Sequence, residues 1–264
     1  NLISYLIRNA DNVLIGKFWG ETALGLYSRA YMLSSLPIDQ VNQPISHVVI
    51  PMLSRVQSDP ERFRRYYIAA LGLAASLGMP IIAFALADAT LLITVLLGER
   101  WLDAVPILLA LGPAAFLGVT HISTGWVFIS LGQTKRLFRW TLVTGVTIAL
   151  AFAIGLPFGA IGLALAYSAV TIALRVPGIV YCYRGTPLRV RDFFLALMVP
   201  TAASIGAAAL LIGLRQWIHV HANVFVQILI DAIVYGLAFS TIYAIFPQGR
   251  RNLHLIKGLA GSVV

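Results

Sequence analysis

The sequence contains one cysteine, Cys182, among its 264 residues. A single thiol cannot form a disulfide within the chain and cannot supply a cysteine metal site. Charged residues make up only 11% of the chain, whereas a typical soluble domain has roughly 25%. Ten residues are acidic, and they form no paired acidic motif or nucleophile arrangement of the kind that an enzyme requires. The sequence therefore predicts no cofactor and no metal, and it argues against an enzyme.

Apolar residues are abundant instead, at 59% of the chain. Several runs reach the roughly 20 residues that a bilayer-spanning helix needs. We therefore predict an all-α, polytopic membrane helix bundle. The net charge of +9 would suggest a nucleic-acid partner in a soluble protein, but here the basic loops that set membrane orientation explain it, so we expect no nucleic acid.

The apolar runs predict about eight transmembrane helices separated by short polar loops. Their expected ranges are Asn1–Phe18, Ala23–Val56, Tyr66–Ala87, Leu102–Leu131, Trp140–Leu156, Ala160–Tyr183, Phe193–Leu214 and Val224–Phe246. Pro37, Pro44 and Pro51 predict a bend or a locally unwound segment in the second span, and Gly112-Pro113 predicts a kink in the fourth. The segment from Ala89 to Leu97 is too short to span and is expected at the membrane interface.

The basic residues alternate between the two sets of loops. Thirteen of the 19 Lys and Arg residues fall on the side that holds residue 1, and only Lys17, Arg100 and Arg215 fall on the other. Cytoplasmic loops carry the excess of Lys and Arg. The sequence therefore predicts that both ends of this segment are cytoplasmic, in the inner (plasma) membrane of a bacterium, with the basic loops touching anionic membrane lipids.

The first 55 residues read as two helices joined by a turn at Gly20-Glu21, each with its polar residues on one face. In the first helix this face holds Asn1, Ser4, Tyr5, Arg8, Asn9, Asp11 and Asn12; in the second it holds Ser28, Arg29, Ser35, Asp39, Gln40, Asn42, Gln43, Ser46 and His47. Charges inside a bilayer are costly and face a protein interior or a watery cavity. Two such helices side by side predict one wall of a hydrophilic cavity in a transporter for a polar, anionic substance.

Arg29 is the foremost candidate for binding that cargo, because a guanidinium stays charged and grips phosphate through two parallel bonds. The alternative is an arginine that snorkels to the nearby interface. Arg8 and Asp11 are three residues apart, so they form either a self-neutralising pair or part of the cavity. Gln43 lies on the same polar face as Asp39.

Asp39 could carry a coupling proton or sodium ion, but a structural pair with Arg29 or with a neighbouring helix is the favoured interpretation. His47 and His121 are lone histidines within spans. Each is expected to be a buried, hydrogen-bonded residue more often than a proton relay. Arg175 is expected near the cytoplasmic end of the sixth span, where it snorkels. His219 and His221 are weak evidence for a metal, since they have no further ligands nearby in sequence.

The stretch from Arg8 to Leu33 resembles the opening of the C-terminal lobe of bacterial polysaccharide repeat-unit (Wzx-type) flippases, in the multidrug/oligosaccharidyl-lipid/polysaccharide exporter superfamily. The residues that carry the resemblance are Asp11-Asn12, Ile15-Gly16, Gly20, Leu24-Gly25-Leu26-Tyr27 and Ala30. The Pro51 region and the Leu97-Gly98 to Trp101 turn are also similar. The similarity covers about the first 135 residues.

The resemblance implies a six-helix lobe at residues 1–183, two additional helices at 184–246 and a basic cytoplasmic tail at 247–264. It implies alternating access, with undecaprenyl-pyrophosphate-linked oligosaccharide carried from the cytoplasmic to the periplasmic face. One lobe cannot enclose a cavity that two lobes share. We therefore expect a fragment, completed by a missing N-terminal lobe, or else a second copy of the chain, with polysaccharide synthesis machinery as a further possible partner.

Three other functions compete with the flippase interpretation. A multidrug/cation antiporter of the same superfamily would have an acidic, aromatic-lined cavity, whereas these two helices hold both signs of charge. A membrane polysaccharide polymerase, ligase or glycosyl transferase would need converging catalytic groups, which the short loops do not supply. A non-transporting lobe that scaffolds a synthesis complex is the last alternative.

Overall fold

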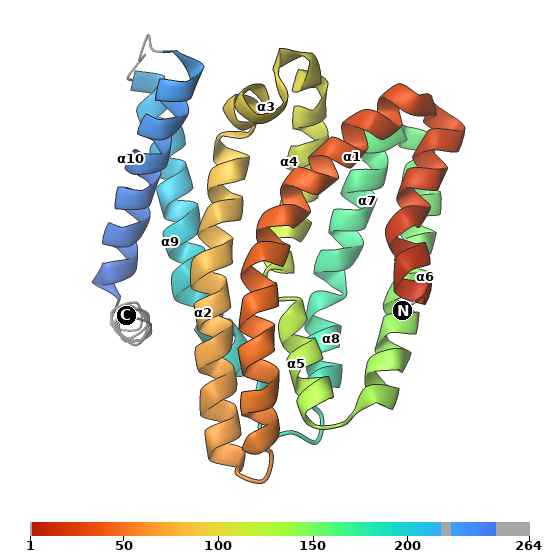
Figure 1. Cartoon of the computed structure of the whole chain (residues 1–264), viewed down its shortest axis with the longest axis vertical. Helices are drawn as coiled ribbons and strands as arrows, with labels where there is room; N and C mark the ends of the chain where they lie inside the picture. The colour runs from red at the N-terminus through yellow and green to blue at the C-terminus, as the bar shows by residue number, and fades with distance from the viewer. Residues whose placement is uncertain (1, 218–222, 247–264) are drawn as a thin grey trace.

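The computed structural model describes residues 2–217 and 223–246, and for residues 2–10 and Trp217 it describes the backbone alone. Figure 1 shows long helices lying side by side along one axis, and the described residues form no strand, as the all-α prediction requires. The helices are α1 (Leu2–Arg55), α2 (Pro60–Ala87), α3 (Ala89–Leu97), η1 (Glu99–Ala104), α4 (Val105–Gly118), α5 (Ile122–Ser130), α6 (Thr134–Gly155), η2 (Leu156–Phe158), α7 (Gly159–Ala173), α8 (Arg175–Tyr183), α9 (Val190–Trp217) and α10 (Val224–Ile245).

Helix α1 consists of two arms that meet at Gly20, the one residue of α1 with non-helical backbone angles (φ +83°). Glycine adopts a positive φ without the steric cost that a side chain brings. The two arms fold back on each other there, as the sequence predicted, and Figure 1 shows them as a red hairpin at the top of the molecule. Ser28 Oγ donates to Asn12 Oδ1 at 3.2 Å across the two arms.

The second arm of α1 stays helical through Pro37, Pro44 and Pro51, so no unwound segment forms there. Figure 1 shows this arm running obliquely from the hairpin and then turning upright beside α2. The prolines thus accompany a change of direction within a continuous helix, which is the bend that the sequence allowed.

Helix α4 continues through Gly112 and Pro113 to Gly118 without an interruption, and the kink expected at these residues stays a prediction. The interruption lies at residues 119–121 instead, between α4 and α5. An ideal Cβ on Gly112 would lie 2.5 Å from Leu86 Cδ2, and one on Gly78 would lie 2.4 Å from Val119 Cγ1. The glycines in this region therefore allow close packing of α2 against α4 and against the residues that follow α4.

Five helical segments are long and apolar enough to cross a membrane: Pro60–Ala87, Glu99–Ser130, Thr134–Tyr183, Val190–Gln216 and Val224–Ile245. The segment Thr134–Tyr183 reverses at Gly159 (φ +75°), so that α6 and α7 lie antiparallel (Figure 1). Helix α1 is not among the five, because polar residues interrupt its apolar face. The count of eight spans therefore stays a prediction.

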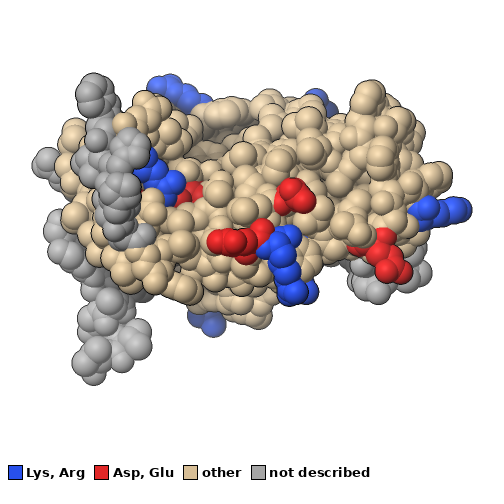
Figure 2. Space-filling view, turned by 90° about the horizontal axis from the view of Figure 1, so that it is seen from above, with Lys and Arg blue, Asp and Glu red and all other residues tan. Residues whose placement is uncertain are grey.

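Outward-facing side chains on α10 are apolar, as lipid contact requires. Leu229, Ile233 and Leu237 repeat every fourth residue and are 62–65% exposed. The end of the bundle seen from above carries few, scattered charged side chains on a largely uncharged surface (Figure 2). Together with the apolar segments, these surfaces identify a multi-pass membrane protein.

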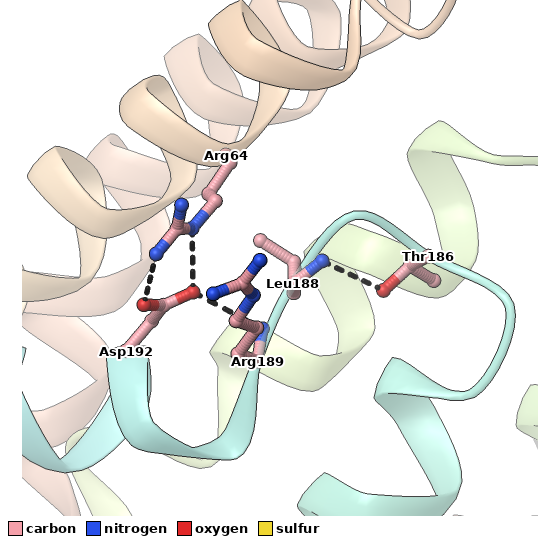
Figure 3. Close-up of polar contacts among 5 residues, drawn as sticks. All are labelled: Arg64, Thr186, Leu188, Arg189 and Asp192. Atoms are coloured by element: carbon pink, nitrogen blue, oxygen red, sulfur yellow. Dashed lines mark hydrogen bonds and ion pairs between the residues drawn. The ribbon is translucent and has the colours of Figure 1, made fainter.

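The last two helices are fastened to α2 by ion pairs at both ends. Near the start of α9, Asp192 accepts from Arg64 Nε at 2.7 Å and Arg64 Nη2 at 2.6 Å, as well as from the Arg189 backbone N–H at 3.1 Å (Figure 3). Near the end of α9, Arg215 Nη2 contacts both Asp88, which precedes α3, and Asp231 of α10. The division at residues 183–184 stays a prediction, but these contacts join α9 and α10 firmly to the preceding helices.

Candidate functional site

A polar groove runs along the second arm of α1, bounded on its other sides by α6, α7 and the interruption between α4 and α5. We call it the α1 groove. Its volume is about 1200 Å³, including the solvent-filled space on its open side. Its polar lining residues are Asp11, Tyr31, Asp39, Asn42, Gln43, His121, Thr141, Thr144 and Tyr167. The polar side chains of this groove lie where the polar faces of α1 predict one wall of a hydrophilic cavity.

Three of the predicted site residues, Asp11, Asp39 and Gln43, line the α1 groove. Asp11 is only 3% exposed. Its carboxylate accepts from Tyr27 Oη at 3.0 Å and from the Asn12 backbone N–H at 2.8 Å. A carboxylate in an apolar environment needs such donors, because an unpaired buried charge is costly. The two arms of α1 thus position Asp11 together.

Asp39 and Gln43 are one helical turn apart and exposed on the open side of the groove. Among the described residues no Lys, Arg or His forms an ion pair with Asp39, so the structure does not bring it onto Arg29. An exposed carboxylate at this position can meet cargo, a coupling ion or a second lobe. Its role stays a prediction.

Arg29 does not line the groove. It is exposed, and its guanidinium lies 5.5 Å from the centroid of the Trp101 ring, which Arg100 also approaches, at 5.6 Å. A tryptophan beside two arginines is typical of the headgroup layer of a membrane. This geometry accords with the snorkelling alternative, while the cavity role of Arg29 stays a prediction.

The other predicted residues are His47, Arg8, His219 and His221. His47 is exposed and lies outside the groove lining. The side chain of Arg8 lies outside the described part of the structure, as do His219 and His221. Within the residues that were described, no group of three or more His, Cys, Asp or Glu side chains is placed to hold a metal ion.

Sequence reasoning missed a second hollow that joins the α1 groove. We call it the Arg175 hollow; it shares Gly118, His121, Thr144, Ile148 and Tyr167 with the groove. Arg175 does not snorkel, since its guanidinium is enclosed by protein and donates to Thr120 Oγ1. The sequence does not reveal this site, because the turn at Leu174 that separates α7 from α8 lies within one long apolar run.

The charges around this connected space are separated. The described ionisable carboxylates on the groove are Asp11 and Asp39, and the arginine lies in the adjoining hollow. Hydroxyl and amide side chains lie between them, together with tyrosine rings and apolar residues such as Ile148 and Phe152. Such a surface can hold a large polar molecule through many hydrogen bonds and grip an anionic group at one end.

Comparison with known proteins gives this site a family context. Residues 1–106 match a family described as "Polysaccharide biosynthesis protein". The chain is 30% identical over 139 residues to the teichuronic acid biosynthesis protein TuaB of Bacillus subtilis, covering 53% of this chain and 29% of the relative. It is 22% identical over 173 residues to the lipopolysaccharide biosynthesis protein WzxC of Escherichia coli, covering 65% and 35%.

A further relative is the succinoglycan biosynthesis transport protein ExoT of Rhizobium meliloti, 24% identical over 220 residues that cover 81% of this chain and 43% of the relative. The chain thus spans less than half the length of these curated relatives. No solved structure matches. The resemblance expected from the sequence is confirmed as a similarity to bacterial polysaccharide biosynthesis and transport proteins.

Proposed function

We propose that this chain forms one lobe of a transporter that exports polysaccharide by flipping undecaprenyl-pyrophosphate-linked oligosaccharide across the bacterial inner membrane. The observation that carries the proposal is the α1 groove, a hydroxyl- and amide-lined surface within a bundle whose outer face is apolar. A membrane protein keeps such polar groups only where they face other protein, cargo or water rather than lipid. The names of the relatives, a teichuronic acid biosynthesis protein and a succinoglycan biosynthesis transport protein, favour polysaccharide as the cargo.

The groove has an open side, so a second lobe or a second copy of this chain is needed to close it. In the proposed cycle the two lobes rock about the cargo and expose it first to the cytoplasm and then to the periplasm. Residues 1–183 form the rocking lobe, with Asp11, Asp39 and Gln43 facing the sugars. Both ends of the segment lie in the cytoplasm, and the helices cross the membrane eight times.

The test is the amount and sidedness of undecaprenyl-pyrophosphate-linked oligosaccharide in cells that lack the complete protein. Accumulation on the cytoplasmic face with loss of surface polysaccharide is the expected result. Normal lipid intermediates together with normal surface polysaccharide would contradict the proposal. An excess of unpolymerised repeat units on the periplasmic face would instead identify a polymerase or ligase step.

A second candidate, a multidrug/cation antiporter, is favoured by one feature of the groove. Its described ionisable groups other than His121 are the carboxylates of Asp11 and Asp39, and aromatic rings of Tyr31 and Tyr167 lie beside them. Asp39→Asn in the complete protein separates the candidates. A cation antiporter would lose resistance to cationic drugs while surface polysaccharide stays normal, whereas a flippase would show no change in drug resistance.

A further inference from the structure

Arg175 lies where two neighbouring membrane helices are both interrupted. It is the first residue of α8, directly after the break at Leu174, and its Nη2 donates to Thr120 Oγ1 in the break between α4 and α5. The backbone stays hydrogen-bonded at both turns, for example from the Thr120 N–H to Leu117 O and from the Leu174 N–H to Val170 O. Turns of this kind within membrane helices are tolerated where they line a cavity. Arg175 therefore occupies a position that the fold keeps polar.

The charge of Arg175 is not balanced by protein. No Asp or Glu among the described residues forms an ion pair with it, and its Nε is buried without a hydrogen-bond partner. Its guanidinium lies 5.3 Å from the Phe193 ring centroid, a weak compensation for the lost hydration. A buried cation without an anion is strongly destabilising, so a bound anion would resolve the imbalance.

The adjoining surface offers further donors. Thr171 Oγ1 is also buried without a partner, and both Thr171 and Arg175 line the Arg175 hollow. His121, which lines the hollow, directly precedes α5, and that helix has no side-chain cap. The hollow encloses about 90 Å³, which is several times the roughly 10–15 Å³ that one bound water molecule requires by the same measure.

We propose that the Arg175 hollow is an anion site that binds a phosphate group, with Arg175 as the principal contact and Thr171 as a second donor. Because the hollow opens into the α1 groove, this deepens the proposed function by naming the residue that takes the phosphate end of the cargo. The same chemistry fits the pyrophosphate headgroup of a lipid or free inorganic pyrophosphate, and the two sources are separated by the experiment.

The experiment uses the complete protein in phosphatidylcholine nanodiscs, with two probes: inorganic pyrophosphate added to the buffer, and undecaprenyl pyrophosphate incorporated in the disc. Saturable binding is measured by calorimetry for the first and by the rise in unfolding temperature for the second. Arg175→Gln should weaken binding roughly 10- to 100-fold, the loss expected for charge-assisted hydrogen bonds. Thr171→Val, which keeps the side-chain shape, should weaken it roughly 3- to 10-fold.

Arg139→Gln is the matched control, because Arg139 is exposed near the start of α6 and lies outside the hollow; binding should be unchanged. Response to both probes assigns a phosphate site open to free anions, and response to the lipid alone assigns a headgroup site. Response to neither probe, or binding by Arg175→Gln equal to wild type, overturns the proposal.

Thr171→Val keeps the test decisive if Arg175→Gln fails to fold, since unchanged binding by this variant would contradict the two-donor site. Binding is measured without transport. A protein that exports polysaccharide but binds neither probe therefore overturns this site alone, and one that binds through Arg175 but exports nothing overturns the proposed function alone.

Discussion

At the scale of single residues, Asp11 shows how this chain keeps a carboxylate within an apolar bundle. The sequence placed Asp11 beside Arg8, but the described partner lies sixteen residues further along, where Tyr27 donates its hydroxyl across the hairpin. Tyr27 is itself fully buried. The hydrogen bond therefore does two things: it satisfies the carboxylate and it fixes how the two arms of α1 meet.

Tyr27→Phe removes this hydroxyl and keeps the ring. The variant should lose about 1–3 kcal/mol of unfolding free energy, because a buried acceptor loses its side-chain donor. Thermal or denaturant unfolding of the purified protein in detergent measures the loss. Tyr66→Phe is the control, since the Tyr66 hydroxyl has no hydrogen bond among the described residues; equal stability losses in the two variants would refute the assigned role of Tyr27.

At the scale of elements, the attachment of α9 and α10 depends on one arginine at one end of the bundle. The Arg215 side chain is 30% exposed, whereas the side chain of Asp88 is fully buried and that of Asp231 is 10% exposed. Burial raises the pKa of the Asp88 carboxyl above its ordinary value, and the charge of Arg215 opposes that rise. The ion pair therefore holds a desolvated carboxylate in place between α2 and α3.

Arg215→Gln should destabilise the protein by up to about 3 kcal/mol, less than for a fully buried pair because Arg215 is partly solvated. In the variant the folded-state pKa of Asp88 rises further above its unfolded value. The loss should then be largest at neutral pH and should shrink as the pH falls through that raised pKa, since Asp88 becomes neutral.

Unfolding measured from pH 7 down to pH 4 tests this dependence. Arg191→Gln is the control: Arg191 is exposed at the start of α9 and has no ion pair among the described residues. A pH-independent loss in Arg215→Gln would show that Asp88 is not the group left unpaired.

At the scale of the whole molecule, the distribution of basic residues predicts orientation. Lys135 lies near the start of α6 and Arg100 lies in η1, at opposite ends of the bundle (Figure 1). Both residues are exposed, and Cys182 is the one cysteine of the chain and is buried. A Cys182→Ser background therefore allows single cysteines to report which side of the membrane each end faces.

Lys135→Cys should be protected from a membrane-impermeant maleimide in intact cells, and Arg100→Cys should be labelled. The reason is the excess of Lys and Arg in loops on the side of Lys135. Labelling after permeabilisation confirms that both thiols are reactive. Labelling of Lys135→Cys in intact cells, with protection of Arg100→Cys, would reverse the proposed orientation.

Much of the fold was predictable from local patterns. The turn at Gly20, the polar faces of α1, the short helix Ala89–Leu97 and the reversal at Gly159 follow from backbone freedom and from the length of apolar runs. The groove residues Asp11, Asp39 and Gln43 followed from helical periodicity, since residues on one face of a helix share one environment.

The sequence by itself determined the class of the protein, its likeness to polysaccharide transport proteins, and the polar wall of α1, because these depend on composition and on spacing within one helix. Tertiary structure alone decided that Arg29 lies on Trp101, that α4 breaks after Gly118 rather than at Pro113, and that Arg175 is turned inward. Those outcomes depend on contacts between residues distant in sequence, such as Arg175 with Thr120. The burial and pairing of a charge are set by its neighbours in space, and no pattern along one helix records them.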